Sequence, residues 1–279
     1  MSSLSETGIT PDAPLLLIGC GKMGGALLNG WIAGGLPAAA VAIAEPSPAP
    51  ELITLAAEDG LRLASDAASL DIAPRAIIAA IKPQMMETIM PALGQRFGTA
   101  PTWLSIAAGT PISLFERIAG DGARVVRVMP NTPSAVGKGV SALFANPAAT
   151  EADHAMASAL LDAVGTTVWL ETEAQMDVVT GVSGSGPAYV FHLIEALAKA
   201  AQAEGLAPEL AMALARQTVI GAAALADAAP ESAATLRENV TSPGGTTAAG
   251  LSVLMGYEGL PDLMTRTVAA AAQRSRELS

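Results

Sequence analysis

A glycine-rich stretch near the N-terminus, Gly19-Cys20-Gly21-Lys22-Met23-Gly24, constrains the fold of this chain more than any other feature. Before it, residues 14–18 form an apolar run typical of a buried strand. After it, apolar residues recur at helical spacing until Gly34 and Gly35 end the pattern. A G-x-G-x-x-G sequence between a strand and a helix is the turn that holds the pyrophosphate of a dinucleotide. We therefore predict a nucleotide-binding unit here, in preference to a glycine-rich turn without a ligand.

The residue types in this motif have separate physical roles. Gly19 permits a tight turn, Gly21 lets the backbone approach a pyrophosphate, and Gly24 lets the helix pack closely on the strand. Cys20 is expected to be a small buried filler rather than a nucleophile, because no histidine is near it in the sequence. Lys22 is expected either to lean toward a phosphate or to remain a solvated surface lysine.

Strands and helices alternate along the chain to about residue 170. Strands are expected at residues 41–44, 61–64, 76–81, 102–106 and 124–128, with late strands at 139–145 and 166–170. Helices are expected at residues 49–59, 85–97, 112–119 and 151–164. This alternation predicts a parallel sheet, in which ligands bind beyond the carboxyl ends of the strands. Glu45, at the end of the second strand, lies 21 residues beyond Gly24, where an acid binds the adenosine ribose hydroxyls.

After residue 170 the pattern changes to helices alone. They are expected at residues 188–204, 208–228, 231–239, 248–254 and from 261 onward. This half is rich in alanine and slender, so it cannot bury all its apolar surface alone, which favours a homodimer through these helices. The chain thus divides into a flexible arm at residues 1–13, an α/β dinucleotide-binding domain at 14–170 and an all-α domain at 171–279.

Composition narrows the class of partner and compartment. With 26 acidic and 15 basic residues the net charge is −11, which disfavours nucleic acid and requires any anion to be recognised locally. The single cysteine allows no internal disulfide and fits a reducing compartment, which we take to be the cytoplasm. Residues 1–14 lack the features of a signal peptide, and no uncharged apolar run has the bulk of a membrane helix.

A second motif in the helical half predicts an anion site. The turn Ser242-Pro243-Gly244-Gly245 is followed by Thr246 and Thr247, which open the apolar run at 248–254. A helix N-terminus presents free N–H groups and a partial positive charge, so a carboxylate or phosphate can be held there without Arg or Lys. The alternative is an ordinary turn capped by threonines.

The available side chains limit the chemistry. Only His154, His192 and Cys20 offer nitrogen or sulfur ligands, and they lie in unrelated segments, so no metal site is expected. A ketone or alcohol substrate would need a Lys, His or Tyr acid–base group. A protonated C=N bond needs only alignment and a hydrogen bond at nitrogen. The lack of an obvious acid–base candidate therefore favours imine reduction.

Six stretches, taken in order along nearly the whole chain, resemble the pyrroline-5-carboxylate reductase family. They are IGCGKMG (18–24), IKPQ (81–84), SIAAG (105–109), VMPNTP (128–133), GSGPAY (184–189) and NVTSPGGTT (239–247). The resemblance implies reduction of L-1-pyrroline-5-carboxylate to L-proline by NAD(P)H, the final step of proline biosynthesis. It also implies a Rossmann domain followed by a helical dimerisation domain, active sites at the dimer interface, and dimers that often assemble into rings.

The resemblance assigns roles to the residues of these motifs. The pyrophosphate should be held by Gly19, Cys20, Gly21, Lys22, Met23 and Gly24. The cofactor should be lined by Ile81, Lys82, Pro83, Ala107, Ala108 and Gly109, and its nicotinamide by Met129, Pro130 and Asn131. The substrate carboxylate should be bound by Ser242, Pro243, Gly244, Gly245, Thr246 and Thr247. Thr247 is the candidate catalytic residue, through a hydrogen bond to the ring nitrogen.

The loop after the second strand bears on the choice of cofactor. Glu45 favours NADH because an acid binds the ribose hydroxyls and repels a 2′-phosphate. Ser47 fits NADPH, which family members commonly use with a small polar residue or Arg in this loop. We expect NADH by a small margin.

Two other functions are compatible with the same architecture. A β-hydroxyacid-type dehydrogenase would need a catalytic lysine on the long helix after the GSG sequence, and Lys199 lies more than three turns into that helix. A non-catalytic dinucleotide-sensing protein would bind the cofactor without turning over pyrroline-5-carboxylate.

Overall fold

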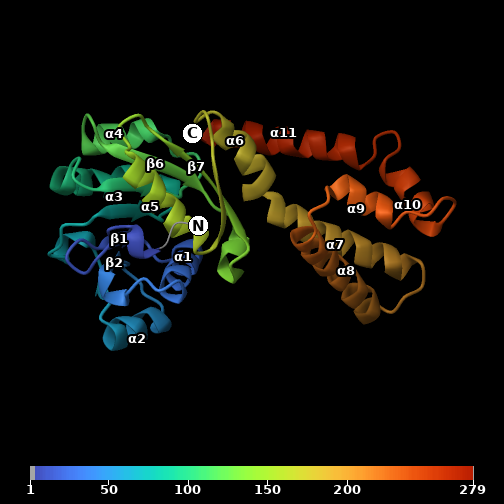
Figure 1. Cartoon of the computed structure of the whole chain (residues 1–279), viewed down its shortest axis with the longest axis horizontal. Helices are drawn as coiled ribbons and strands as arrows, with labels where there is room; N and C mark the ends of the chain where they lie inside the picture. The colour runs from blue at the N-terminus through green and yellow to red at the C-terminus, as the bar shows by residue number, and fades with distance from the viewer. Residues whose placement is uncertain (1–3, 279) are drawn as a thin grey trace. The chain divides into compact units, whose positions relative to one another are not determined.

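The computed structural model describes residues 4–278 of the chain. The chain forms two compact units, Met1–Gly184 with Ala271–Ser279 and Ser185–Ala270. Strands occur only in the first unit among the described residues, and the second unit is helical (Figure 1). The expected class, an α/β dinucleotide-binding domain followed by an all-α part, is confirmed.

The first unit is built on one eight-stranded sheet with the order β3-β2-β1-β4-β5-β6-β7-β8. The strands are β1 Leu15–Ile18, β2 Val41–Ala44, β3 Arg62–Ala64, β4 Ala76–Ala79, β5 Thr102–Ser105, β6 Arg124–Met129, β7 Gly139–Ala145 and β8 Gly165–Trp169. The order of the first six strands is that of dinucleotide-binding sheets, in which the cofactor crosses the sheet where the strand order reverses. Here that point lies between β1 and β4.

One pair of strands departs from the expected parallel sheet. β7 runs antiparallel to β6, while the other neighbouring strands are parallel. Residues 130–138 connect β6 to β7 and contain only the short 3-10 helix η4, Thr132–Val136. A parallel pair needs a crossover of about a dozen or more residues, so this short connection turns the chain back on itself.

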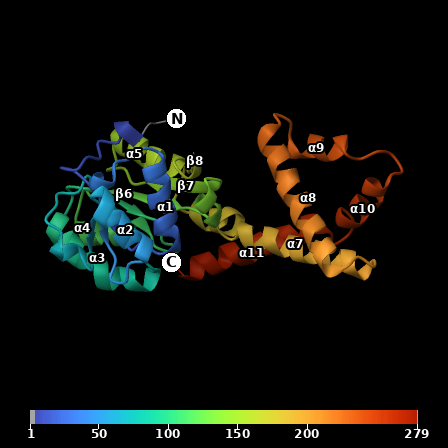
Figure 2. The same ribbon diagram turned by 90° about the horizontal axis from the view of Figure 1, so that it is seen from below.

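Helices cover both faces of the sheet (Figures 1 and 2). Those of the first unit are α1 Lys22–Ala33, α2 Pro50–Asp59, α3 Pro83–Phe97, α4 Ile112–Ala119, α5 Glu151–Asp162 and α6 Gln175–Val179. Successive strand residues point to opposite faces of the sheet. Leu15 of β1 therefore belongs to the same core as Trp31 of α1, and Leu16 belongs to the core that contains Met90 of α3. The two cores hold the carboxyl ends of β1, β2 and β4 at one edge.

The N-terminal segment packs on this unit. Leu4 and Ile9 are buried in the core that contains Trp31, and the guanidinium of Arg62 donates to the Pro11 carbonyl at 2.7 Å. This differs from the flexible arm that the polar composition predicts, because two apolar side chains are enough to anchor residues 4–13. Residues 1–3 lie outside the described part of the chain.

The second unit contains α7 Gly186–Ala203, α8 Pro208–Ala228, α9 Ala233–Asn239 and α10 Thr246–Leu254, with the start of α11, Leu260–Leu278. α7 and α8 pack side by side (Figure 2). The buried residues of this unit are all small: Ala198, Ala211 and Ala215. Most of its large apolar side chains are therefore exposed.

Helix α8 is long and apolar enough, by length and composition alone, to cross a membrane. Only 11% of its apolar window is buried within the chain. This differs from the expectation that no run has the bulk of a membrane helix. A surface of this kind is covered either by a membrane or by the apolar face of another protein chain.

Candidate active site

The glycine-rich turn lies at the carboxyl end of β1 and leads into α1. Gly19 has φ +86°, and a β-carbon there would lie 2.9 Å from the Ala80 carbonyl oxygen of the neighbouring β4 segment. At Gly24 a β-carbon would lie 2.6 Å from the Gly19 carbonyl oxygen. A side chain at either position would therefore displace the backbone, and these two glycines are required by the turn and by its packing.

No conformational or steric constraint within the protein explains why position 21 is a glycine. Its φ of −69° is open to any residue, and a β-carbon there would meet nothing within 4 Å. Gly21 is also the N-cap of α1 and makes no side-chain cap, so the first N–H groups of α1 have no cap from it. The space left by the missing side chain lies where the pyrophosphate of a dinucleotide approaches such a turn. The residues present thus fit a dinucleotide.

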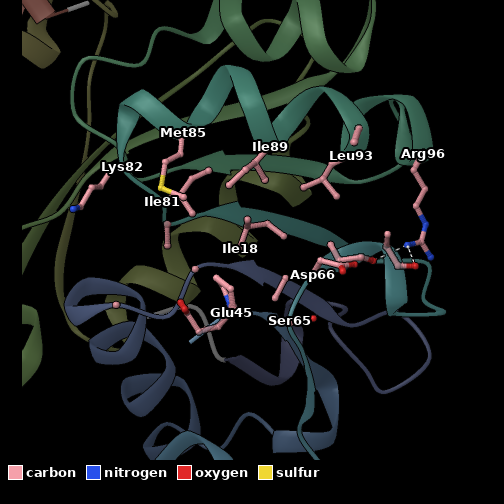
Figure 3. Close-up of a pocket in the computed structure, with 18 residues that line it drawn as sticks. Ile18, Glu45, Ser65, Asp66, Ile81, Lys82, Met85, Ile89, Leu93 and Arg96 are labelled. Carbon is pink, nitrogen blue, oxygen red and sulfur yellow. Dashed lines mark hydrogen bonds between the residues drawn. The ribbon is translucent and has the colours of Figure 1, made fainter. Parts of the chain in front are cut away.

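A pocket of about 480 Å³ opens beside this turn (Figure 3). That volume lies within the range of roughly 300–1,000 Å³ common for small-molecule sites. One side of the pocket is formed by apolar residues of α3, Met85, Ile89 and Leu93. Other lining residues come from the ends of β1, β2 and β4 and from residues 65–68 after β3. Four strand ends and one helix therefore enclose it.

Glu45 links the glycine-rich turn to the loop after β2. One carboxylate oxygen accepts a hydrogen bond from the Cys20 N–H at 2.8 Å, and the other accepts from the Ser47 N–H at 3.0 Å. Burial, reinforced by the negative charge of Glu45, raises the pKa of the Cys20 thiol to about 11. The thiol therefore stays protonated at neutral pH, which argues against a nucleophile. Cys20 is only half-buried, which differs from the buried filler that was expected.

The predicted cofactor residues gather in two places at this edge. Gly19, Gly21, Glu45, Ile81 and Lys82 line the 480 Å³ pocket. A second, more open pocket of about 540 Å³ contains Gly21 and Glu45 again, together with the predicted residues Cys20, Lys22 and Ser47. The other predicted cofactor residues line neither of these two pockets: Met23, Gly24, Pro83, Ala107, Ala108, Gly109, Met129, Pro130 and Asn131. The two pockets share the glycine-rich turn.

Gly109 was expected to line the cofactor, and the structure gives another reason for the glycine. Its φ is +70°, and a β-carbon would lie 2.9 Å from the Leu278 carbonyl oxygen. The end of α11 therefore requires a small residue at this position.

The Asn131 side chain is engaged within the protein and is 8% exposed. Its oxygen accepts from the Val140 N–H of β7 at 2.9 Å, and its nitrogen donates to the Ser183 carbonyl at 3.1 Å. Ser183 belongs to a π-helical segment, Thr180–Gly184, that directly follows α6. The structure therefore shows Asn131 holding this segment, where sequence reasoning expected a nicotinamide contact.

Sequence reasoning missed the other residues of this pocket: Ile18, Ala44, Pro46, Ser65, Asp66, Ala67, Ala68, Ala80, Met85, Ile89, Ala92, Leu93 and Arg96. Those at 65–68 follow the carboxyl end of β3, so the same strand-end rule that selected Glu45 would have selected them. The α3 residues recur at spacings of three and four on one helix face, a pattern that is also typical of ordinary core packing.

The turn at Ser242 has the geometry of a type II turn. The Gly245 N–H donates to the Ser242 carbonyl at 3.1 Å, and Gly244 has φ +69°, so Pro243 and Gly244 occupy the positions that favour them. Gly245 is the N-cap of α10, and the Ala249 N–H donates back to its carbonyl. The N–H groups of Thr246 and Thr247, in the first turn of α10, come before this bond and have no partner within the helix, and both residues are exposed.

The comparisons with known proteins cover both halves of the chain. The chain is 38% identical to the pyrroline-5-carboxylate reductase of Pseudomonas aeruginosa over 95% of its own length and 96% of that protein. It is 39% identical to that of Methanosarcina acetivorans, over 94% and 96%. The chain belongs to the pyrroline-5-carboxylate reductase family. The family model for pyrroline-5-carboxylate reductase dimerisation matches residues 173–278, and that for the NADP oxidoreductase, coenzyme F420-dependent, matches 15–109.

Solved structures of the family have the same fold. A pyrroline-5-carboxylate reductase from Coxiella burnetii is 33% identical, with a TM-score of 0.89 over 96% of this chain and 99% of that one. The Plasmodium falciparum pyrroline carboxylate reductase, solved with NADP bound, is 27% identical, with a TM-score of 0.80 over 96% and 99%. The Rossmann-type domain and the helical family dimerisation domain are therefore those of a pyrroline-5-carboxylate reductase.

Proposed function

We propose that this protein reduces L-1-pyrroline-5-carboxylate to L-proline with NAD(P)H, the final step of proline biosynthesis. The observation that carries the proposal is family membership over 95% of the chain at 38% identity. The glycine-rich turn with its open position at Gly21, beside a pocket at the carboxyl edge of the sheet, supports it independently.

The first unit would hold the cofactor. N–H groups of the glycine-rich turn and the positive end of α1 would bind the pyrophosphate, and the apolar face of α3 would cover the adenosine half. When bound, the reduced nicotinamide supplies a hydride to the C=N carbon. Met129 and Pro130, at the carboxyl end of β6, would lie beside the nicotinamide, and Asn131 would support this edge by holding Ser183.

The turn at Ser242 would bind the substrate. N–H groups at the start of α10 and the hydroxyls of Ser242 and Thr246 would hold the carboxylate. The Thr247 hydroxyl oxygen would accept a hydrogen bond from the protonated ring nitrogen, which keeps the electrophilic carbon oriented. The ring nitrogen brings its own proton as an iminium and keeps it in the amine product, so no separate protein acid is needed at the hydride step.

We also propose a homodimer through the second unit, with rings of dimers as its further assembly. Exposed apolar side chains on α7 and α8, such as Leu193 at 51% and Leu214 at 50%, support this. The family dimerisation match includes α8, so we infer that a second copy, and not a membrane, covers this helix. A cytoplasmic location is supported by the single cysteine.

Glu45 supports NADH as the preferred cofactor. Its carboxylate accepts from the Ser47 and Cys20 N–H groups, and this fixed negative charge beside the glycine-rich turn would repel a 2′-phosphate. In paired kinetics we expect kcat/KM to be higher with NADH, and Glu45→Ser to move the ratio toward NADPH by about ten-fold. A wild-type preference for NADPH would contradict this assignment.

The activity itself is tested by following loss of reduced-cofactor absorbance with pyrroline-5-carboxylate and both cofactors. Turnover with formation of proline is the expected result. Oxidation of a β-hydroxyacid without imine reduction would instead favour the dehydrogenase alternative. Tight NAD(P)H binding without turnover of either substrate would favour a dinucleotide-sensing role.

A further inference from the structure

We infer that Arg96 is a positioning residue for the adenosine half of the cofactor, acting through the turn that forms one wall of the pocket. The inference deepens the proposed function and rests on its nucleotide cofactor. Arg96 lies at the far end of α3 from Lys82, and both line the 480 Å³ pocket (Figure 3).

The wall opposite α3 is short and needs support. It consists of residues 65–68, which lead from the end of β3 into the three-residue 3-10 helix η3, Ala67–Ser69. The segment from 65 to 75 has no strand pairing, because β3 ends at Ala64 and β4 begins at Ala76. A helix this short has almost no internal hydrogen bonds to fix it.

Side chains form hydrogen bonds with the free backbone groups at both ends of η3. At its start, the Asp66 carboxylate accepts from the Ser69 N–H at 3.0 Å. At its end, one guanidinium nitrogen of Arg96 donates to the carbonyls of Ala67 at 2.7 Å and Ala68 at 3.3 Å, and another donates to that of Leu70 at 2.5 Å. A cation at the carbonyl end of a helix is favourable, and the planar guanidinium serves several acceptors at once.

One helix therefore determines both sides of the pocket. Met85 and Ile89 of α3 form one wall directly (Figure 3). Arg96 of the same helix fixes Ala67 and Ala68 on the other wall through its hydrogen bonds to their carbonyls. The guanidinium carbon also lies 4.8 Å from the centre of the neighbouring Phe97 ring, which restricts its rotamers. The spacing between the walls thus depends on the Arg96 hydrogen bonds, and a flat purine requires that spacing to be maintained.

The test separates the adenosine half of the cofactor from the nicotinamide half. In the full-length enzyme, Arg96→Met keeps the apolar stem and removes the donors. We expect the Kd of AMP and of NADH, measured by calorimetry, to rise about three- to ten-fold, the Kd of nicotinamide mononucleotide to change less than about two-fold, and kcat at saturating cofactor to be unchanged. Arg96→Lys, which keeps the charge, should recover part of the AMP affinity.

Arg117→Met is the matched control, because Arg117 is an exposed residue of α4 whose guanidinium donates to the Ser113 carbonyl of its own helix. It should bind AMP as the wild type does. Unchanged AMP affinity in Arg96→Met would overturn the inference, since burial of Ala67 and Leu70 would then suffice to fix the wall. An equal loss of AMP and nicotinamide mononucleotide affinity would also overturn it, as general damage to the site. Because these are binding measurements, an enzyme that binds NADH but does not reduce pyrroline-5-carboxylate would count against the proposed function alone.

Discussion

At the residue scale, Thr247 is the position on which the proposed hydride transfer depends most. It is the second residue of α10 and is exposed in the isolated chain, so its hydroxyl is available to a substrate held at the start of that helix. We expect Thr247→Ala to lower kcat/KM for pyrroline-5-carboxylate about ten-fold or more, the loss of one hydrogen bond to a charged group. Steady-state kinetics at saturating cofactor would measure this.

Thr247→Ser keeps the hydroxyl and should retain most of the activity. Thr265→Ala is a suitable control, because the Thr265 hydroxyl donates to the Pro261 carbonyl on an exposed part of α11. If Thr247→Ala has wild-type kinetics, Thr247 has no part in the mechanism.

Asn131 and Gly109 show what motif matching leaves open for single residues. Both belong to stretches that place them beside the cofactor, yet the Asn131 amide is engaged by Val140 and Ser183, and Gly109 is required by the end of α11. Their partners lie 9 or more residues away in the sequence. A motif gives the order of residues along a loop, whereas the direction of each side chain depends on such distant partners. The open position at Gly21 agrees with the glycine pattern, because it concerns the backbone alone and needs no distant partner.

At the scale of elements, Asp153 joins four parts of the first unit at the amino-terminal ends of the neighbouring strands β4, β5 and β6. Its fully buried carboxylate accepts hydrogen bonds from Arg75 before β4 at 3.2 Å, from Thr102 of β5 at 2.5 Å and from Arg124 of β6 at 3.4 Å. The other carboxylate oxygen accepts from the Thr150 N–H and hydroxyl, which completes a capping box at the start of α5. The network thus fixes α5 against the sheet.

This network predicts how stability depends on pH. Burial alone would raise the pKa of Asp153, but hydrogen bonds from Thr102 and Thr150 and the charge of Arg124 lower it to about 2. The unfolded state therefore binds more protons between about pH 4 and pH 2, so this contribution, roughly 2 kcal/mol, is present above pH 4 and is lost as the pH falls through that range. Urea unfolding at a series of pH values would measure it.

Asp153→Asn should destabilise the protein at neutral pH by about 3 kcal/mol, because it leaves the two arginines without their buried partner. The free energy of unfolding of this variant should also fall less steeply than that of the wild type between about pH 4 and pH 2. Asp121→Asn, in the exposed turn before β6, is the control and should retain the wild-type profile. An acid limb in Asp153→Asn as steep as that of the wild type would show that other carboxylates account for the dependence.

The elements were more predictable than their connections. Helices such as α4 and α8 were located from apolar spacing and from Pro or Gly at their ends, because these are local properties. The antiparallel β7 and the π-helical segment at Thr180 were not foreseen. The direction of a strand depends on the path that the connection before it takes through the folded unit. The π-helical segment is held by a hydrogen bond from Asn131 to Ser183, 52 residues apart in the sequence. The packing of the N-terminal segment likewise depends on a core that only the folded unit provides.

At the scale of the whole molecule, the two units differ in how they bury apolar surface. The first has cores on both sides of its sheet, while the second buries Ala198, Ala211 and Ala215 and leaves Leu193 and Leu214 about half exposed. A soluble monomer rarely exposes so many large apolar side chains on adjacent helices. The family dimerisation match covers these helices. We therefore expect their exposed apolar side chains to become buried when two copies of the chain associate.

We therefore expect a dimer in light scattering at micromolar concentration and a Tm that rises with protein concentration, because association stabilises only the folded chain. Leu193→Glu on α7 and Leu214→Glu on α8 should weaken the dimer at least about ten-fold, since each would bury an unpaired charge at the interface. Ile53→Glu is the matched control: Ile53 is 52% exposed on α2, in the nucleotide-binding unit, and its replacement should leave the dimer intact. A wild-type monomer would exclude the dimer, and a dimer indifferent to both leucine replacements would exclude an interface through α7 and α8. If the dimer dissociates and activity falls in parallel while NADH affinity is kept, the reaction itself depends on the second copy.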